Sequence, residues 1–188
     1  MEAAEKYSNL SPAAPWPGGA VFTAEGPGGK RFFLRAVSKA EAGATPFLSH
    51  PVLPVYVETV SLQKDGKENK FLVYEHFEGE SAASILARGG TFSEFEALKT
   101  GYETARALKY LHGLSPRVAH GAVSPASVFK CKNGRVLLCG CAAAGDIRAD
   151  LKGFAGLLRA LAAAPAGGRY SDPYFKMLEY LELPEIEA

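Results

Sequence analysis

Four side chains in the middle of the chain are of types that can bind a transition metal: Cys131, Cys139, Cys141 and His120. Thiolates and imidazoles are the usual protein ligands of zinc. The cysteine spacing does not match that of a zinc knuckle, and alternate residues of a strand often face one core. We therefore expect three buried thiols here, with no metal and no cofactor.

Residues 120–129 read His-Gly-Ala-Val-Ser-Pro-Ala-Ser-Val-Phe and offer two hydroxyls as candidate nucleophiles. A serine becomes a strong nucleophile when a neighbouring base, itself oriented by a third group, removes its proton. Neither Ser124 nor Ser127 has a His and an acidic residue in such an arrangement. The segment alone predicts no catalysis, so its meaning depends on the elements around it.

The N-terminal part of the chain is predicted to form antiparallel strands with little helix. Residues 21–24 and 31–37 are strand-like and flank a turn of glycines and a proline. Residues 52–62 and 70–74 make a second pair around an Asp-Gly dipeptide, which is a hairpin signature.

Helical patterns follow. Ser93 with Glu96 forms a capping box, which predicts that a helix begins there. Apolar residues in this helix recur at spacings of three and four, so we expect one face to be buried. The residues of that face are Phe95, Leu98, Tyr102, Ala105, Leu108 and Leu111.

The remaining C-terminal pattern predicts a short hairpin and two more helices. Residues 128–138 form the hairpin around an Asn-Gly turn. The helices are expected at residues 150–164 and 171–183, the second with Pro173 in its first turn. An antiparallel sheet followed by helices indicates an α+β fold and argues against a parallel βαβ sheet.

Within this order of elements, residues 120–129 resemble the catalytic loop of a eukaryotic protein kinase, His-Arg-Asp-Leu-x-Pro-x-Asn followed by two apolar residues. The His, the Pro and the apolar frame are present. Gly121, Ala122 and Ser127 stand where the family has its Arg, its catalytic Asp and its Mg²⁺-holding Asn.

Other kinase motifs are matched in the family's order. Residues 19–24 resemble the end of the Gly-rich loop, and Arg35 stands at the position of the strand lysine. Residues 72–79 are similar to the hinge, with Tyr74 at the gatekeeper position. Gly140 replaces the Asp of Asp-Phe-Gly.

The resemblance covers residues 16–165, and within that range residues 150–155 resemble the start of the central large-lobe helix of the family, with its Asp at Asp150. It implies that His120 packs inside the large lobe and that Asp150 accepts backbone N–H bonds from the loop around His120 and Gly121. Only residues 143–149 replace the activation segment.

The fold implied is a two-lobed protein kinase-like fold. We expect an irregular leader at residues 1–17, a small antiparallel β lobe at 18–75 and a reduced, mostly helical lobe at 76–188. The cleft between the lobes has two possible states: open, or filled by side chains such as Tyr74 and Trp16.

Phosphoryl transfer by kinases depends on a lysine, two metal-holding groups and a base. Ala122 and Gly140 cannot supply a base or a metal ligand, and Ser127 is a weak, neutral one. The guanidinium of Arg35 also does not simply replace an ammonium. Because the base, the metal-holding groups and the activation segment are missing, the resemblance implies a degenerate, shortened pseudokinase that is not an enzyme. We expect a protein-binding scaffold, a subunit of a larger assembly.

Two other functions stay open. In a nucleotide-binding regulator or atypical phosphotransferase, Arg35 would contact phosphate while the hinge at Glu75 and Phe77 holds adenine. In the second possibility, the chain is an α+β binding domain unrelated to kinases. A thermal shift with ATP separates the first of these from the scaffold.

Charge and hydropathy limit the partners and the compartment. Lysine and arginine total 21 against 20 acidic residues, which gives no electrostatic case for nucleic acid or an anionic membrane. The most apolar stretch, residues 151–164, contains Lys152 and Arg159 and is too short to span a bilayer. An odd number of cysteines and a charged N-terminus predict an intracellular, reducing compartment, either the cytoplasm or an organelle.

Overall fold

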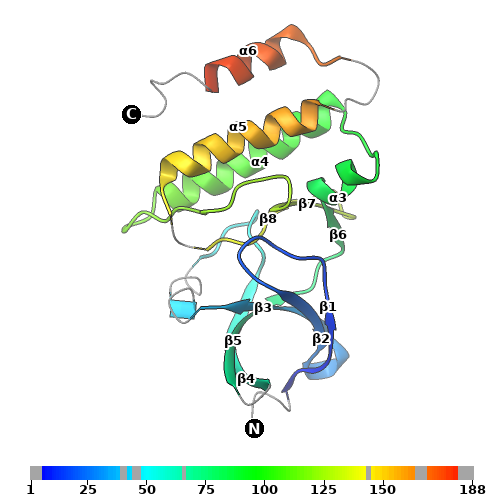
Figure 1. Cartoon of the computed structure of the whole chain (residues 1–188), viewed down its shortest axis with the longest axis vertical. Helices are drawn as coiled ribbons and strands as arrows, with labels where there is room; N and C mark the ends of the chain where they lie inside the picture. The colour runs from blue at the N-terminus through cyan, green and yellow to red at the C-terminus, as the bar shows by residue number, and fades with distance from the viewer. Residues whose placement is uncertain are drawn as a thin grey trace.

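We use a computed structural model of the chain, which describes residues 6–38, 42–43, 48–64, 67–142, 145–163 and 169–181. An antiparallel sheet lies at one end of the long axis and a layer of helices at the other, with a small second sheet between them (Figure 1). The fold class and the two-lobed arrangement expected from the sequence are confirmed.

The small lobe is a five-stranded sheet in the order β1-β2-β3-β5-β4. Its strands are β1 (Ser8–Pro12), β2 (Val21–Glu25), β3 (Arg31–Val37), β4 (Tyr56–Lys64) and β5 (Lys67–Glu75). All neighbouring pairs are antiparallel. The Asp-Gly turn expected between β4 and β5 falls outside the described residues.

Strand β4 begins at Tyr56, later than the sequence predicts. Val52 and Leu53, expected in the strand, are buried in the core of the large lobe instead. The Val52 carbonyl accepts a hydrogen bond from the Leu138 N–H at 2.7 Å. Their apolar character therefore reflects contact between the lobes and not the alternation of a strand.

Strand β1 corrects the prediction of an irregular leader. Ser11 pairs with Thr23 and Pro12 with Phe22 of β2. All five side chains of β1 are exposed, so the strand lacks the apolar alternation by which a half-buried strand is recognised. The strand is recognised by its backbone pairing with β2.

In its described residues, the large lobe combines a three-stranded antiparallel sheet with four helices. The strands are β6 (Gly79–Ser81), β7 (Val128–Cys131) and β8 (Val136–Leu138), and the helices are α3 (Ala82–Ala87), α4 (Glu94–His112), α5 (Ile147–Ala162) and α6 (Asp172–Leu181). Helices α4 and α5 lie side by side, and α6 packs on α5 (Figure 1). The short elements β6 and α3 were not predicted.

Helix α5 begins three residues before the predicted start at Asp150, because Asp146 caps it by accepting the Arg148 N–H at 3.0 Å. The capping box of α4 is present as predicted: Glu96 N–H donates to Ser93 Oγ, and Ser93 N–H donates to Glu96 Oε2.

The buried face of α4 differs from the predicted one. Leu108 and Leu111 are buried, whereas Phe95, Leu98, Tyr102 and Ala105 are exposed. Smaller residues face the core in their place: Ala97, Thr100, Gly101, Thr104 and Ala107. The cause is close helix packing, since a Cβ on Gly101 would lie 2.6 Å from a methyl of Leu158 in α5.

Candidate functional site in the cleft between the lobes

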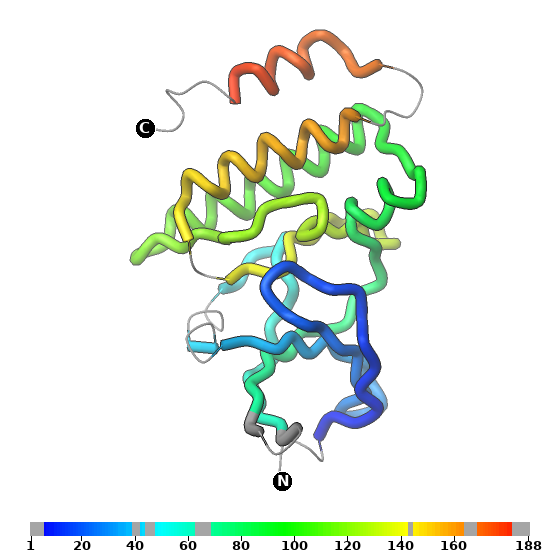
Figure 2. Tube along the Cα trace, viewed as in Figure 1, coloured from blue at the N-terminus to red at the C-terminus, as the bar shows by residue number. Residues whose placement is uncertain are grey.

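The segment between β1 and β2 folds back from the small sheet towards the large lobe, as the dark-blue tube in Figure 2 shows. Trp16 and Gly19 form an isolated antiparallel bridge within it. This bridge makes a tight loop and turns the Trp16 side chain into the molecule, where it is only 3% exposed.

The indole of Trp16 fills the space between the two lobes. Its ring centroid lies 5.4 Å from that of Phe33 in β3 and 5.4 Å from that of Tyr74 in β5. The rings of Phe77 and of Phe129 in β7 follow at 5.9 and 6.2 Å. One aromatic cluster therefore joins the small lobe, the segment after β5 and the large lobe.

The loop carrying Trp16 also presses its backbone against Gly140, just after β8. Gly140 has φ +80°, and a Cβ there would lie 2.6 Å from the Pro17 carbonyl oxygen. A side chain is therefore excluded twice, by the backbone angle and by the contact. At the position resembling a metal-binding aspartate, the structure uses glycine to let two backbone segments meet.

Arg35 lies beneath this contact and is fully buried. Its Nη1 donates to the Cys141 carbonyl at 3.2 Å, and its Nη2 donates to the Gly18 carbonyl at 3.3 Å. The guanidinium thus joins the loop to the segment after β8. Burial raises the pKa of the neighbouring Tyr74, so its phenol stays neutral near pH 7.

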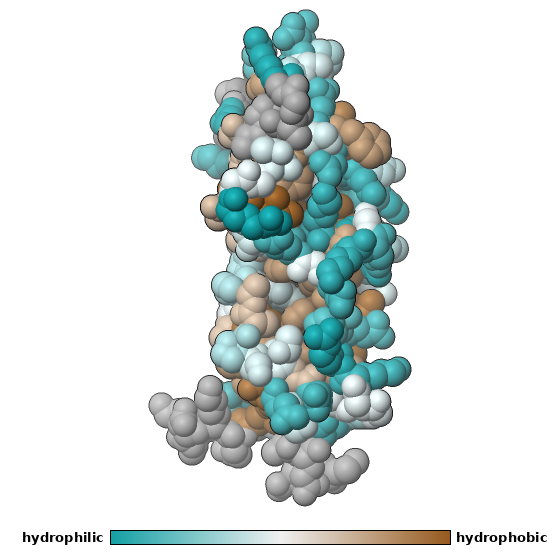
Figure 3. All heavy atoms as spheres, turned by 90° about the vertical axis from the view of Figure 1, so that its right-hand side faces the viewer, coloured by the Kyte–Doolittle hydropathy of each residue, from teal (hydrophilic) through white to brown (hydrophobic). Residues whose placement is uncertain are grey.

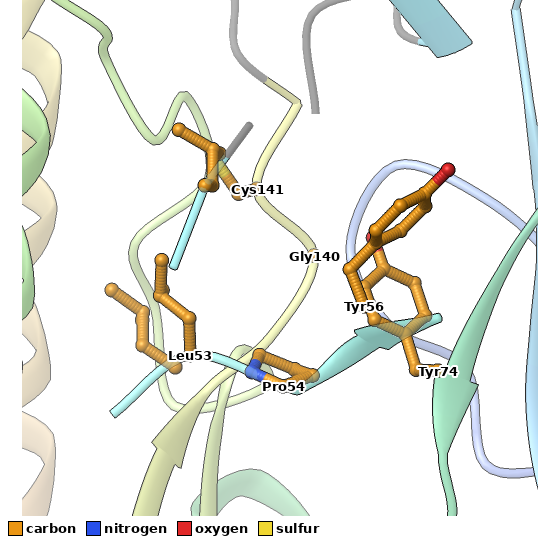
Figure 4. Close-up of a pocket in the computed structure, with 8 residues that line it drawn as sticks. Leu53, Pro54, Tyr56, Tyr74, Gly140 and Cys141 are labelled. Atoms are coloured by element: carbon orange, nitrogen blue, oxygen red, sulfur yellow. The ribbon is translucent and has the colours of Figure 1, made fainter. Parts of the chain in front are cut away.

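The space left inside the cleft is small. A cavity of about 20 Å³ lies between Leu53, Pro54 and Cys141 on one side and Tyr56 and Tyr74 on the other (Figure 4). That volume holds about one water molecule.

A larger hollow, about 330 Å³, opens to solvent on the outer side of the aromatic cluster. Trp16, Phe33 and Phe77 line it, together with Arg31 and Lys132. Charged and polar side chains cover much of the face that carries β6 and α3, with apolar patches between them (Figure 3).

The three residues considered for a nucleotide do not converge on one open cavity. Arg35 is held by main-chain carbonyls, and the Phe77 ring stacks on Trp16. The Glu75 residue is exposed and its N–H donates to the Val55 carbonyl.

The loop that resembles the catalytic loop is held by its own hydrogen bonds. Ser127 is fully buried; its Oγ accepts the Ser124 N–H at 3.0 Å and donates to the Ser124 carbonyl at 2.8 Å. Gly121 has φ +81°. The Ala122 N–H donates to Nδ1 of His120 at 3.3 Å. The side chains of His120 and Ser127 thus bond to the backbone of the loop itself.

Asp150 anchors that loop from α5. Its carboxylate is 1% exposed and accepts the N–H groups of His120 and Gly121 at 2.6 and 2.8 Å, the contact expected from the resemblance. His112 Nε2, at the end of α4, lies 2.9 Å from the same carboxylate. This third partner was missed, because nothing in the sequence distinguishes His112 from an ordinary helix-end residue.

His120 itself is completely buried, and burial lowers its pKa to about 4. The imidazole is therefore neutral near pH 7. With Nδ1 accepting the Ala122 N–H, its proton lies on Nε2. His120 thus packs inside the large lobe.

The three cysteines are free, buried thiols. Burial raises the pKa of Cys131 and raises that of Cys139 strongly, which keeps both protonated and unreactive. Among the described residues, no three His, Cys, Asp or Glu side chains are grouped so that they could hold a metal ion. Within the same residues, no helix is both long and apolar enough to cross a membrane.

Comparison with known proteins gives matches by structure and none by sequence: no family model and no curated protein matches the chain. The Neurospora crassa PAN3 pseudokinase superposes with a TM-score of 0.75 and 15% identity over 97% of this chain, and a mutant of it with 0.74 and 15% over 96%. The present chain covers 58% of each of those chains.

The kinase domain of Mycobacterium tuberculosis PknI matches with a TM-score of 0.64 and 22% identity, covering 91% of this chain and 79% of that one. The likeness thus extends to a pseudokinase and to a kinase domain, and at these identities the superposition shows the fold alone. The chain has a protein kinase-like fold.

Proposed function

We propose that this chain is a non-catalytic pseudokinase that serves as a protein-binding scaffold in a larger assembly. The observation that carries the proposal is the buried indole of Trp16, which lies in the cleft between the lobes against Phe33, Tyr74 and Phe129. A flat nucleotide base would have to displace it.

The chemistry of the cleft supports the same proposal. Phosphoryl transfer needs a base and groups that hold Mg²⁺ against the phosphates. The positions that resemble those groups carry Ala122, Ser127 and Gly140, of which only Ser127 has a polar side chain. Since that hydroxyl bonds to the Ser124 backbone, it is engaged in a turn.

The way in which the cleft is closed supports a scaffold role. The guanidinium of Arg35 and the Trp16 cluster join the lobes through buried contacts. A molecule joined in this way presents outer surfaces in a fixed relation, which suits it to hold partners. We place it in a reducing compartment, in keeping with its three free thiols.

One observation favours a second function, a nucleotide-binding regulator. The hollow of about 330 Å³ outside Trp16 combines aromatic walls with two cations, Arg31 and Lys132. Both cations contact Glu78, at 3.7 and 2.9 Å. Because exposed pairs of this kind contribute little to stability, a phosphate could replace that carboxylate.

The test is thermal unfolding of the full chain with excess ATP, with and without Mg²⁺. A scaffold with a filled cleft predicts no shift in either condition. Binding at about 100 times the dissociation constant would add roughly 2.7 kcal/mol and support the regulator. The matched variants are Arg31→Ala and Lys132→Ala, which would abolish a shift that arises in the outer hollow.

A second measurement tests the scaffold directly. The tagged chain, purified from its own cells under native conditions, is expected to elute with a protein partner in a fixed ratio. Elution as a single chain, at the mass of the chain alone, would count against a scaffold in an assembly.

A further inference from the structure

Helix α4 carries an apolar stripe on its solvent side. The outer stripe consists of Phe95, Leu98 and Tyr102, which are 76%, 42% and 65% exposed. These residues are spaced at i, i+3 and i+7 and therefore share one face over about 10 Å of helix. Single exposed apolar residues are ordinary on a protein surface, but two aromatic residues and a leucine aligned on one helix face mark an interaction site.

The helix beneath the outer stripe is held rigidly. Its opposite face packs against α5, where Gly101 meets Leu158. On one flank, Glu96 pairs with Lys130 of β7, and the Lys99 ammonium donates to the Gly134 carbonyl at 2.8 Å. The outer stripe is thus presented in a fixed conformation, so a partner would lose little free energy in ordering it.

The charges beside the outer stripe are positive except for one carboxylate. Lys99, Arg106 and Lys109 are all exposed on the outward side of α4. Glu103 is the acidic residue among them, and it pairs with Arg106 at 2.9 Å. The Arg106 guanidinium also lies over the Tyr102 ring, 5.7 Å from its centroid. A partner that covers the apolar residues would therefore meet cations along its edge.

The shape of the surface selects the kind of partner. The outer stripe is a convex ridge on one helix, and the side-chain ridges of one helix pack into the grooves of another. An amphipathic partner helix offers such grooves along its apolar face. Acidic residues flanking that face would complement the three cations.

We propose that the outer stripe is the docking surface for an amphipathic helix of a partner protein, with an apolar seam flanked by Asp and Glu. This inference rests on the scaffold function proposed above and names the chemistry of its partner. A second copy of the chain is a poorer occupant, because it would bring the same three cations to the interface. An anionic membrane is disfavoured because only one short face of α4 is free to insert.

The experiment uses displayed helical peptides selected on the full-length chain. The peptides have leucine at the heptad a and d positions and an equal mixture of Glu, Lys and Gln at the flanking e and g positions. Selection is expected to enrich Glu at the flanks. Binding of an enriched peptide should weaken at least tenfold in the Phe95→Gln/Tyr102→Gln variant, which keeps good helix formers on the surface.

Two further variants test the position of the binding surface and the contribution of its charges. Tyr180→Gln removes an equally exposed aromatic residue (64% exposed) from α6 and should leave affinity unchanged. Lys109→Glu should weaken the Glu-rich peptides severalfold while leaving the fold intact. Raised salt should weaken binding in the same direction.

Other outcomes overturn the inference. In the selection, these are enrichment of Lys at the e and g positions, or no enrichment of any residue there. In the binding assays, they are peptide binding that survives the double variant and self-association of the chain that the double variant abolishes. A further one is binding to vesicles of phosphatidylcholine and phosphatidylserine in preference to the peptides. None of these outcomes changes the result of the ATP thermal shift, and none changes whether native purification detects a protein partner. Failure of the docking surface is therefore distinguishable from failure of the scaffold function.

Discussion

Replacing Trp16 with alanine tests the filled cleft directly. The chain contains a single tryptophan, and its side chain is 3% exposed among aromatic rings from both lobes. Removing a buried Trp or Phe side chain from a core typically costs about 3–5 kcal/mol, as transfer free energy and as the free energy of the cavity left behind. We expect Trp16→Ala to fall within that range.

The expected change in melting temperature follows from the size of the chain. For 188 residues, the entropy of unfolding near the midpoint is about 0.4 kcal/mol per kelvin. A loss of about 4 kcal/mol therefore lowers Tm by about 10 °C. The matched control is Tyr180→Ala, in which an exposed ring is removed without a cavity; it should change Tm by no more than 2 °C or so, within the usual range for surface substitutions.

The cavity itself gives a second, more specific readout. An apolar cavity stays dry and binds small aromatic molecules of matching shape. Added indole should therefore raise the Tm of Trp16→Ala and leave the wild type unchanged, as followed by differential scanning calorimetry. A cost below about 1 kcal/mol, together with no response to indole, would refute the placement of Trp16 in the cleft.

Three further predictions concern the large lobe and the loop against it. Asp150→Ala leaves the buried N–H groups of His120 and Gly121 without their acceptor, so we expect a loss of about 1–3 kcal/mol in urea unfolding; an unchanged midpoint would contradict the anchoring role. Because the pKa of His120 is lowered to about 4 from its usual 6.5, the unfolded state binds a proton between these pH values that the folded state does not. The free energy of unfolding should therefore fall by up to about 3 kcal/mol as the pH falls from 6.5 to 4. His120→Gln should show a correspondingly smaller loss over that range. Gly140→Ala introduces a Cβ at φ +80° and 2.6 Å from the Pro17 carbonyl oxygen, so a loss of at least about 1 kcal/mol is expected by thermal unfolding, and a neutral effect would show that the two segments can separate without cost.

The order of motifs in the sequence predicts the architecture because each motif is a local signal with a physical cause. The capping box at Ser93 and Glu96 satisfies N–H groups that any helix start leaves open, and it predicts the start of α4 correctly. Strand β1 carries no such signal. It is held to β2 by backbone pairing and by polar contacts such as the hydrogen bond from Asn9 to Glu25 at 2.9 Å, none of which gives Ser8–Pro12 an apolar alternation.

The candidate site likewise contains contacts that the sequence predicts and contacts that it does not. The hydrogen bonds from the loop to Asp150 are expected from the resemblance, and the N–H groups of His120 and Gly121 satisfy a carboxylate that is 1% exposed. The position of Trp16 depends on a loop between two strands, one of which was not recognised. Sequence reasoning named Trp16 and Tyr74 as side chains that could fill the cleft; the contact with Gly140 and Arg35 is a matter of tertiary structure.

Helix α4 shows why apolar periodicity alone can select the wrong face. Its large apolar residues at 95, 98 and 102 and its small residues at 97, 101 and 104 both recur at helical spacing. Close packing on α5 favours the small residues, because two helix backbones can approach only where the side chains between them are short. At Gly101 the backbone of α4 comes so near that a Cβ would lie 2.6 Å from a methyl of Leu158 in α5. Once the small residues face inward, the geometry of the helix forces the large ones into solvent. Since Phe95 and Tyr102 keep most of their surface in solvent, at 76% and 65% exposed, a partner that covers them would gain hydrophobic free energy, which is what the peptide selection measures.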